Sequence, residues 1–167
     1  MTRLDIFIAR TVSQRACIDH ALALTAQMTG PVFELGLGNG RTFDHVRARI
    51  GNGPATRAIH VFERAVASNP ASTPDAEQLV LGDIFETLPM MLARFGPVAS
   101  FVHADLAGHN LEKNDTFARA VSPLVEAVMV QGGIMVSSDA MYFETLTALP
   151  LPQGAMPGRA LVYQKQG

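Results

Sequence analysis

The sequence predicts a single α/β domain organised around a mainly parallel sheet of seven strands. One observation is a glycine-rich turn that links a short apolar run at residues 32–35 to an amphipathic stretch. Further short apolar runs then alternate with stretches of helical periodicity, which is typical of parallel βαβ units. Two strand-like runs near the C-terminus, separated by a proline- and glycine-rich loop, predict an antiparallel hairpin.

The first half of the chain alternates helices and strands in the predicted order. Residues 3–29 keep approximate helical spacing and predict one or two helices. After the glycine turn, we expect a helix over 42–50 that ends at the breaker cluster 51–54. Strands follow over 58–63 and 78–81. Between them, Pro70 and Pro74 leave little room for a helix, so this crossover is expected to be irregular.

The second half continues the pattern and ends in the hairpin. We expect helices over 85–95 and 115–131, and strands over 98–105 and 134–137. Pro89 lies near the start of the first helix, where proline is tolerated. Pro123 is expected to kink or divide the second helix, and Gly132 and Gly133 to end it. The hairpin strands are expected within 144–149 and 159–164.

Composition places the chain among globular proteins and excludes several functions. Hydrophobic residues make up 48% and charged residues 17%, which fits one domain over 1–167 with an N-terminal helical segment over 1–29. A net charge of −2, with Lys113 and Lys165 as the only lysines, argues against nucleic acid as a partner. The single Cys17 cannot form an internal disulfide. Without a leader or a membrane-length apolar run, we expect no membrane partner and a cytoplasmic protein.

The glycine turn itself indicates the kind of ligand. A dinucleotide fingerprint has the spacing G-x-G-x-x-G, with a helix N-terminus that receives a pyrophosphate. Here Gly36, Gly38 and Gly40 alternate, so the third glycine arrives one residue early and Arg41 occupies the fingerprint position. Glu34 precedes the first glycine by two residues. A carboxylate there repels a pyrophosphate but attracts the ammonium group of a ligand that carries an amino acid.

This E-x-G-x-G-x-G pattern resembles motif I of the class I S-adenosylmethionine-dependent methyltransferases. The resemblance extends over about residues 30–137 and implies a Rossmann-like, doubly wound fold with S-adenosyl-L-methionine as cofactor. It also implies that the turn surrounds the methionine half of this cofactor. The residues concerned are Glu34, Gly36, Leu37, Gly38 and Asn39.

Later strand ends carry further residues that match the family pattern. Glu63 follows the glycine turn by 23 residues, close to the spacing of a ribose-binding acid, and Arg64 stands beside it. The resemblance implies that Asp83 contacts the adenine amino group and that Ile84 packs near the ring. His103, at the end of the fourth predicted strand, is expected to contact the cofactor.

Catalytic candidates gather where parallel strands end, since open α/β sheets bind ligands at that edge. Asp105 and His109 are the predicted catalytic residues, because a hydroxyl acceptor needs a base to remove its proton. For His109 a simple turn residue is an equal alternative, and Asp139 is either a neighbour of Asp105 or a helix cap. Asp105 and Asp139 also resemble the divalent-metal site of some small-molecule O-methyltransferases. His103 stands where that site has an acid, so we predict no metal.

The predicted function is methyl transfer from S-adenosyl-L-methionine to a small molecule. Two alternatives are a binding or regulatory protein that keeps the cofactor without transferring the methyl group, and a nicotinamide-dependent oxidoreductase. The N-terminal segment either simply packs on the sheet or covers the cofactor, in which case Arg10 and His20 reach the substrate. A homodimer whose partner completes the substrate pocket is the expected assembly for so short a chain.

Overall fold

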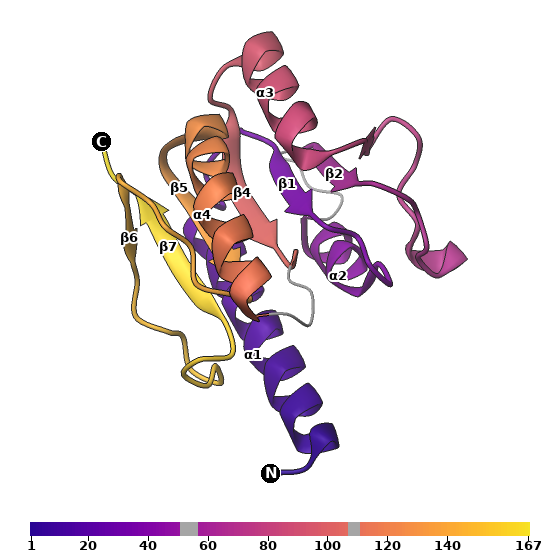
Figure 1. The fold of residues 1–167 in the computed structure, drawn as a ribbon, viewed down its shortest axis with the longest axis vertical. Coiled ribbons are helices and arrows are strands. Elements are labelled where there is room, and N and C mark those ends of the chain that lie inside the picture. The colour runs from indigo at the N-terminus through magenta and orange to yellow at the C-terminus, as the bar shows by residue number, and fades with distance from the viewer. Residues whose placement is uncertain (51–56, 107–110) are drawn as a thin grey trace.

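Seven strands form one mixed sheet in the part of the chain described by the structure, a computed structural model covering residues 1–50, 57–106 and 111–167 (Figure 1). They are β1 (Val32–Leu35), β2 (Ile59–Glu63), β3 (Leu79–Leu81), β4 (Ala99–Ala104), β5 (Met129–Ser137), β6 (Leu146–Ala148) and β7 (Leu161–Lys165). Their order in the sheet is β3-β2-β1-β4-β5-β7-β6. β1 to β5 are parallel, β7 is antiparallel to β5, and β6 is antiparallel to β7. The predicted sheet and terminal hairpin are confirmed.

Helices cover both faces of this sheet, as a doubly wound fold requires. They are α1 (Arg3–Leu24), α2 (Arg41–Ile50), α3 (Ile84–Phe95) and α4 (Leu111–Val128), with a short 3₁₀ helix, η1 (Pro70–Ser72). Adjacent residues of β1 point to opposite faces: Phe33 joins the core that α3 and α4 cover, and Val32 joins the core that α1 and α2 cover. β1 and β4 are buried throughout, which fits their largely apolar sequences. Glu34, Ser100 and His103 are the buried polar residues within them.

The N-terminal segment is a single long helix that only partly packs on the sheet. Thr2 and Asp5 form a capping box at the start of α1. Cys17 and Ile18 in the C-terminal half are buried against the sheet. The N-terminal half extends past the sheet edge (Figure 1). None of the helices within the described residues is long and apolar enough to cross a membrane.

Two expectations about the second half of the chain are wrong. The helix ends at Val128 rather than at residue 131, and β5 begins directly at Met129. Gly132 and Gly133 therefore lie inside the strand, where its pairing with β4 shifts register and Gly132 adopts a φ of 76°. A bulge uses glycine for the same backbone freedom as a helix end, so the sequence alone does not separate the two. α4 also begins at 111 rather than at 115. It continues through Pro123, so this proline does not divide the helix.

The glycine turn between β1 and α2 depends on positive φ angles. Gly36, Gly38 and Gly40 have φ values of 87°, 49° and 79°, a region that other residues rarely adopt. Gly40 also lies against η1, and a Cβ built on it would stand 2.3 Å from the carbonyl oxygen of Ser72. A Cβ on Gly38 would meet no atom within 4 Å. The turn is thus closed on the Gly40 side and open at Gly38.

This difference predicts unequal costs for two alanine substitutions. Gly38→Ala should lower the free energy of unfolding by about 1 kcal/mol, because only backbone strain opposes it. Gly40→Ala should cost at least about 2 kcal/mol more, because the new Cβ also displaces η1. Denaturant unfolding of both variants measures the difference, and equal costs would contradict the close approach of Ser72.

Candidate functional site

A cavity of about 460 Å³ lies between α1 and the glycine turn, next to the carboxyl end of β1. The turn contributes its predicted cofactor residues to one wall. These are Gly36, Leu37, Gly38 and Asn39. α1 supplies the opposite wall with residues from Phe7 to Ile18, and Asp105 lies where β4 ends. α1 therefore lies opposite the glycine turn, and Arg10 lines the cavity whereas His20 is not among its lining residues.

Glu63 holds the glycine turn from the end of β2. One carboxylate oxygen accepts hydrogen bonds from the backbone N–H groups of Leu37, at 2.8 Å, and Gly38, at 3.4 Å. The other oxygen accepts from the N–H of Arg64 at 2.7 Å. Partial burial works to raise the pKa of Glu63, but these backbone donors outweigh it and the pKa is lowered. An ionised carboxylate at this position thus orders the turn.

Asp83 and Ile84, the residues predicted to bind adenine, lie where the chain passes from β3 into α3, close to the end of β2. Asp83 caps α3 by accepting from the N–H of Phe85 at 2.9 Å, and that bond lowers the pKa of Asp83. The guanidinium of Arg64 lies 2.5 Å from Asp83 and joins the ends of β2 and β3. Ile84, the first residue of α3, is buried in the core. Glu63, Arg64 and Asp83 thus follow neighbouring strands, as predicted from the sequence.

A fully buried pair lies below the turn. Glu34 of β1 and His103 of β4 are completely inaccessible to solvent, and Nδ1 of His103 lies 2.9 Å from Oε1 of Glu34. Thr42 donates its hydroxyl to the same oxygen. Burial opposes the imidazolium form, but the adjacent Glu34 carboxylate outweighs it and raises the pKa of His103. Oε2 of Glu34 has no hydrogen-bond partner among the described residues.

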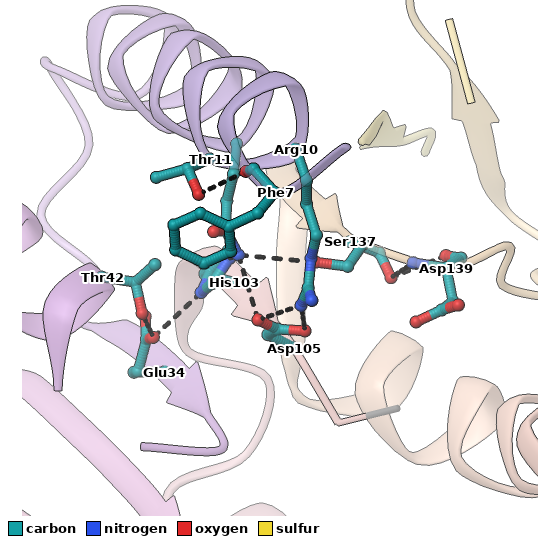
Figure 2. A network of polar contacts seen from close by, with 11 residues as sticks. Phe7, Arg10, Thr11, Glu34, Thr42, His103, Asp105, Ser137 and Asp139 are labelled. Atoms are coloured by element: carbon teal, nitrogen blue, oxygen red, sulfur yellow. Dashed lines mark hydrogen bonds and ion pairs between the residues drawn. The ribbon is translucent and has the colours of Figure 1, made fainter. Parts of the chain in front are cut away.

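A polar chain connects this buried pair to α1 (Figure 2). The side-chain amide nitrogen of Gln14 lies 3.1 Å from Nε2 of His103, and it donates to Asp105 at 3.3 Å and to Ser138 at 3.4 Å. Arg10, one turn earlier on α1, donates to both carboxylate oxygens of Asp105 at 2.6 and 2.7 Å. The edge of the sheet and α1 are therefore linked by charged and amide groups.

Sequence reasoning missed Gln14 and the pairing of Arg10 with Asp105. Arg10 and Gln14 are four residues apart, so they share one face of α1, and this spacing was the available signal. The structure brings His103 and Asp105 together through Gln14, as their common strand end predicted. His109, the second predicted catalytic residue, lies outside the described residues.

Asp139 follows β5 on the far side of Asp105. Its backbone exchanges hydrogen bonds with the hydroxyl of Ser137, at 2.7 and 3.2 Å. Burial, and then the negative charge of Asp105, raise the pKa of Asp139. Across the described part of the chain, no group of three or more His, Cys, Asp or Glu side chains is placed to hold a metal ion.

Comparison with known proteins assigns a family. Residues 1–165 match the model of a family described as S-adenosyl-L-methionine methyltransferase. The chain is 62% identical to the S-adenosyl-L-methionine methyl transferase of Silicibacter pomeroyi DSS-3, whose crystal structure superposes with a TM-score of 0.93; the match covers 99% of each chain. A search of functionally curated proteins gives no match.

More distant solved structures share the fold. One is a TDP-rhamnose 3′-O-methyltransferase of calicheamicin biosynthesis, with 20% identity, a TM-score of 0.61, and coverage of 90% of this chain and 77% of that one. Another is the 1,6-didemethyltoxoflavin-N1-methyltransferase of Burkholderia thailandensis, crystallised with S-adenosylhomocysteine. It has 14% identity, a TM-score of 0.51, and coverage of 92% and 80%.

The Glu34–His103 pair predicts a pH-dependent contribution to stability. Because the folded-state pKa of His103 is raised, this contribution is complete below the ordinary pKa of 6.5 and disappears as the pH rises through the folded-state pKa. Glu34→Gln should therefore lower the free energy of unfolding by about 3 kcal/mol near pH 6. The loss should be smaller at about pH 9. Denaturant unfolding at the two pH values measures it, with exposed Glu77→Gln as the control. A loss independent of pH would contradict the raised pKa.

Proposed function

The chain belongs to the S-adenosyl-L-methionine methyltransferase family, and from this premise we propose that its methyl acceptor is a small molecule bound between α1 and the glycine turn. The cavity there carries the proposal. Its volume of about 460 Å³ lies within the range of small-ligand sites, roughly 300–1,000 Å³. α1 covers it from one side, which leaves a macromolecular substrate little access.

The family assignment confirms the resemblance seen in the sequence and favours methyl transfer over the two alternatives. Neither a binding module without activity nor a nicotinamide-dependent oxidoreductase gains support from the comparisons. The two distant neighbours are named for a nucleotide sugar and for a toxoflavin precursor as acceptors. They support a small acceptor by analogy of fold only.

The glycine turn fits the methionine half of the cofactor. Oε2 of Glu34 is buried without a hydrogen-bond partner among the described residues, and an ammonium group would satisfy it. The open side of Gly38 leaves room for a ligand against the backbone. We assign this end of the cofactor to the residues predicted from the sequence, with His103 supporting it through Glu34. They are Glu34, Gly36, Leu37, Gly38 and Asn39.

The nucleoside half is assigned to the neighbouring strand ends. Glu63 is ionised beside the turn and can accept hydrogen bonds from ribose hydroxyls. Asp83 and Ile84 follow β3 and are assigned to the adenine, with Arg64 holding Asp83 in place. This assignment is supported by the order of the strands, since β1, β2 and β3 are adjacent in the sheet.

Asp105 is the proposed proton acceptor. When bound, the cofactor supplies an electrophilic methyl group on a sulfonium, so the protein's part is to position the acceptor and, for a hydroxyl, to remove its proton. Asp105 lines the cavity with its carboxylate held by Arg10 and Gln14. His109 remains a second catalytic candidate.

The lone Cys17 fits a cytoplasmic location, where disulfides are rare.

A homodimer is also proposed, because the N-terminal half of α1 presents apolar side chains to solvent. Leu4, Phe7 and Ile8 are 66%, 49% and 50% exposed, and Phe7 also lines the cavity. A contiguous apolar surface of this kind is typical of a protein interface. A second copy covering it would complete the outer wall of the cavity.

Turnover tests the role of Asp105. Asp105→Asn should lower kcat by about 100-fold or more for a hydroxyl acceptor found by screening for formation of S-adenosylhomocysteine, because the amide cannot take the proton. Asp75→Asn, an exposed carboxylate away from the cavity, should leave kcat unchanged. Equal kcat for wild type and Asp105→Asn would remove the proposed base.

Light scattering tests the assembly. Wild type is expected to have the mass of a dimer, and the double variant Leu4→Ser with Ile8→Ser that of a monomer, because the exposed apolar face is lost. The control is Met90→Ser, a large exposed apolar residue on α3. A monomeric wild type at about 100 μM, far above the dissociation constant of a stable dimer, would contradict the proposal.

A further inference from the structure

We infer that the acceptor is an anion and that Arg15 and Arg41 bind its carboxylate or phosphate group. This inference rests on the proposed function, because it names the chemical class of the molecule that enters the cavity. It follows from the charges that line the cavity, from how each is paired, and from the charge of the cofactor itself.

The cavity wall carries more positive than negative side chains. Arg10 and Arg15 line the cavity from α1. Arg41, the first residue of α2, lines it directly after the glycine turn. Among the described residues that line the cavity, Asp105 is the one carboxylate, so three arginines against one aspartate leave an excess of two positive charges. His45 also lines the cavity, but its Nε2 lies 2.8 Å from Asp19 and faces that carboxylate.

The excess falls on Arg15 and Arg41. Arg10 donates to both oxygens of Asp105, so these two charges compensate each other. Neither Arg15 nor Arg41 has a carboxylate partner within the described residues, and both side chains are exposed. Some surface arginines outside the cavity are paired, such as Arg47 with Asp44 at 2.6 Å and Arg64 with Asp83 at 2.5 Å. What sets Arg15 and Arg41 apart is that they line the cavity without a carboxylate partner among the described residues.

Arg41 is held toward the cavity by an aromatic ring. Its guanidinium carbon lies 5.8 Å from the centroid of the Phe7 ring on α1, within the range of a cation–π contact. Phe7 and Arg41 both line the cavity. A guanidinium oriented in this way presents a planar set of donors that matches a carboxylate or a phosphate.

The cofactor does not neutralise this excess. S-adenosyl-L-methionine carries a sulfonium, an ammonium and one carboxylate, so on binding it adds a net positive charge. Even if its carboxylate paired with one arginine, the other would remain without an anion. Like charges gathered in a half-enclosed site repel one another, and an anionic acceptor relieves that repulsion. The cofactor-bound enzyme should therefore favour anionic over neutral acceptors.

The cofactor's own carboxylate is the competing source of the same anion chemistry, and two measurements separate it from the acceptor. The first is the affinity for S-adenosylhomocysteine by calorimetry. The second is the response of the ¹H–¹⁵N spectrum of the protein saturated with S-adenosylhomocysteine to benzoate, benzamide and inorganic phosphate. Wild type, Arg15→Gln and Arg41→Gln are compared with Arg3→Gln, which changes an exposed arginine of α1 outside the cavity.

The expected result is selective loss of anion binding. Benzoate and phosphate should shift amide signals at the start of α2 and along α1 in wild type and Arg3→Gln, whereas benzamide should not. The affinity for benzoate and the affinity for phosphate should each fall by about fivefold or more in Arg15→Gln and in Arg41→Gln, as expected for the loss of a charged hydrogen bond. The affinity for S-adenosylhomocysteine should change by less than about twofold, clearly below the loss of about fivefold expected for the anions.

Three results would overturn the inference. Absence of anion binding to the loaded wild type, equal binding of benzamide and benzoate, or a loss of S-adenosylhomocysteine affinity of about tenfold in both variants would each do so. That loss of S-adenosylhomocysteine affinity would mean that Arg15 and Arg41 bind the carboxylate of the cofactor rather than the acceptor. If S-adenosylhomocysteine failed to bind wild type at all, the proposed cofactor site would fall too, and this outcome is visible before any anion is added.

Discussion

The hydrogen bonds from the glycine turn to the carboxylate of Glu63 fix the shape of the site. Gly36 and Gly40 donate their N–H groups to backbone carbonyls, those of Phe62 and Leu37. The N–H groups of Leu37 and Gly38 need an acceptor from elsewhere in the fold, and Glu63 supplies it. The parallel register of β1 and β2 brings Glu63 to that position, since Leu35, the last residue of β1, pairs with Phe62, the residue before Glu63. The sheet topology and one carboxylate together create the open side of the turn.

The opposite wall depends on a different set of polar contacts. α1 packs on the sheet only through its C-terminal half, and its orientation over the turn is held by Arg10 and Gln14. Gln14 contacts His103, which is paired with Glu34 beneath the turn. The buried pair and the wall formed by α1 therefore belong to one continuous polar network, in which Gln14 links His103 to Asp105.

Most of the fold was predictable because periodicity and glycine spacing are local signals. The succession of helices and strands along the chain follows from them, and so do the residues at strand ends such as Glu63 and Asp83. Gly132 was misplaced because a strand bulge and a helix end select the same residue. Gln14 was missed because its partners, His103 and Asp105, are 89 and 91 residues away. Its spacing from Arg10 indicates a shared helix face but not what that face contacts. The cavity could not be predicted from the sequence either, because it forms only where α1 packs against the glycine turn.

Calorimetric titration with S-adenosylhomocysteine tests the central claim, that the turn organised by Glu63 is the cofactor site. Wild type, Glu63→Ala and the exposed control Glu77→Ala are compared. The account predicts binding to wild type and Glu77→Ala, and a loss of about tenfold or more, or roughly 1.4 kcal/mol, in Glu63→Ala. Equal affinities of Glu63→Ala and wild type would contradict it, and the cofactor would have to bind elsewhere.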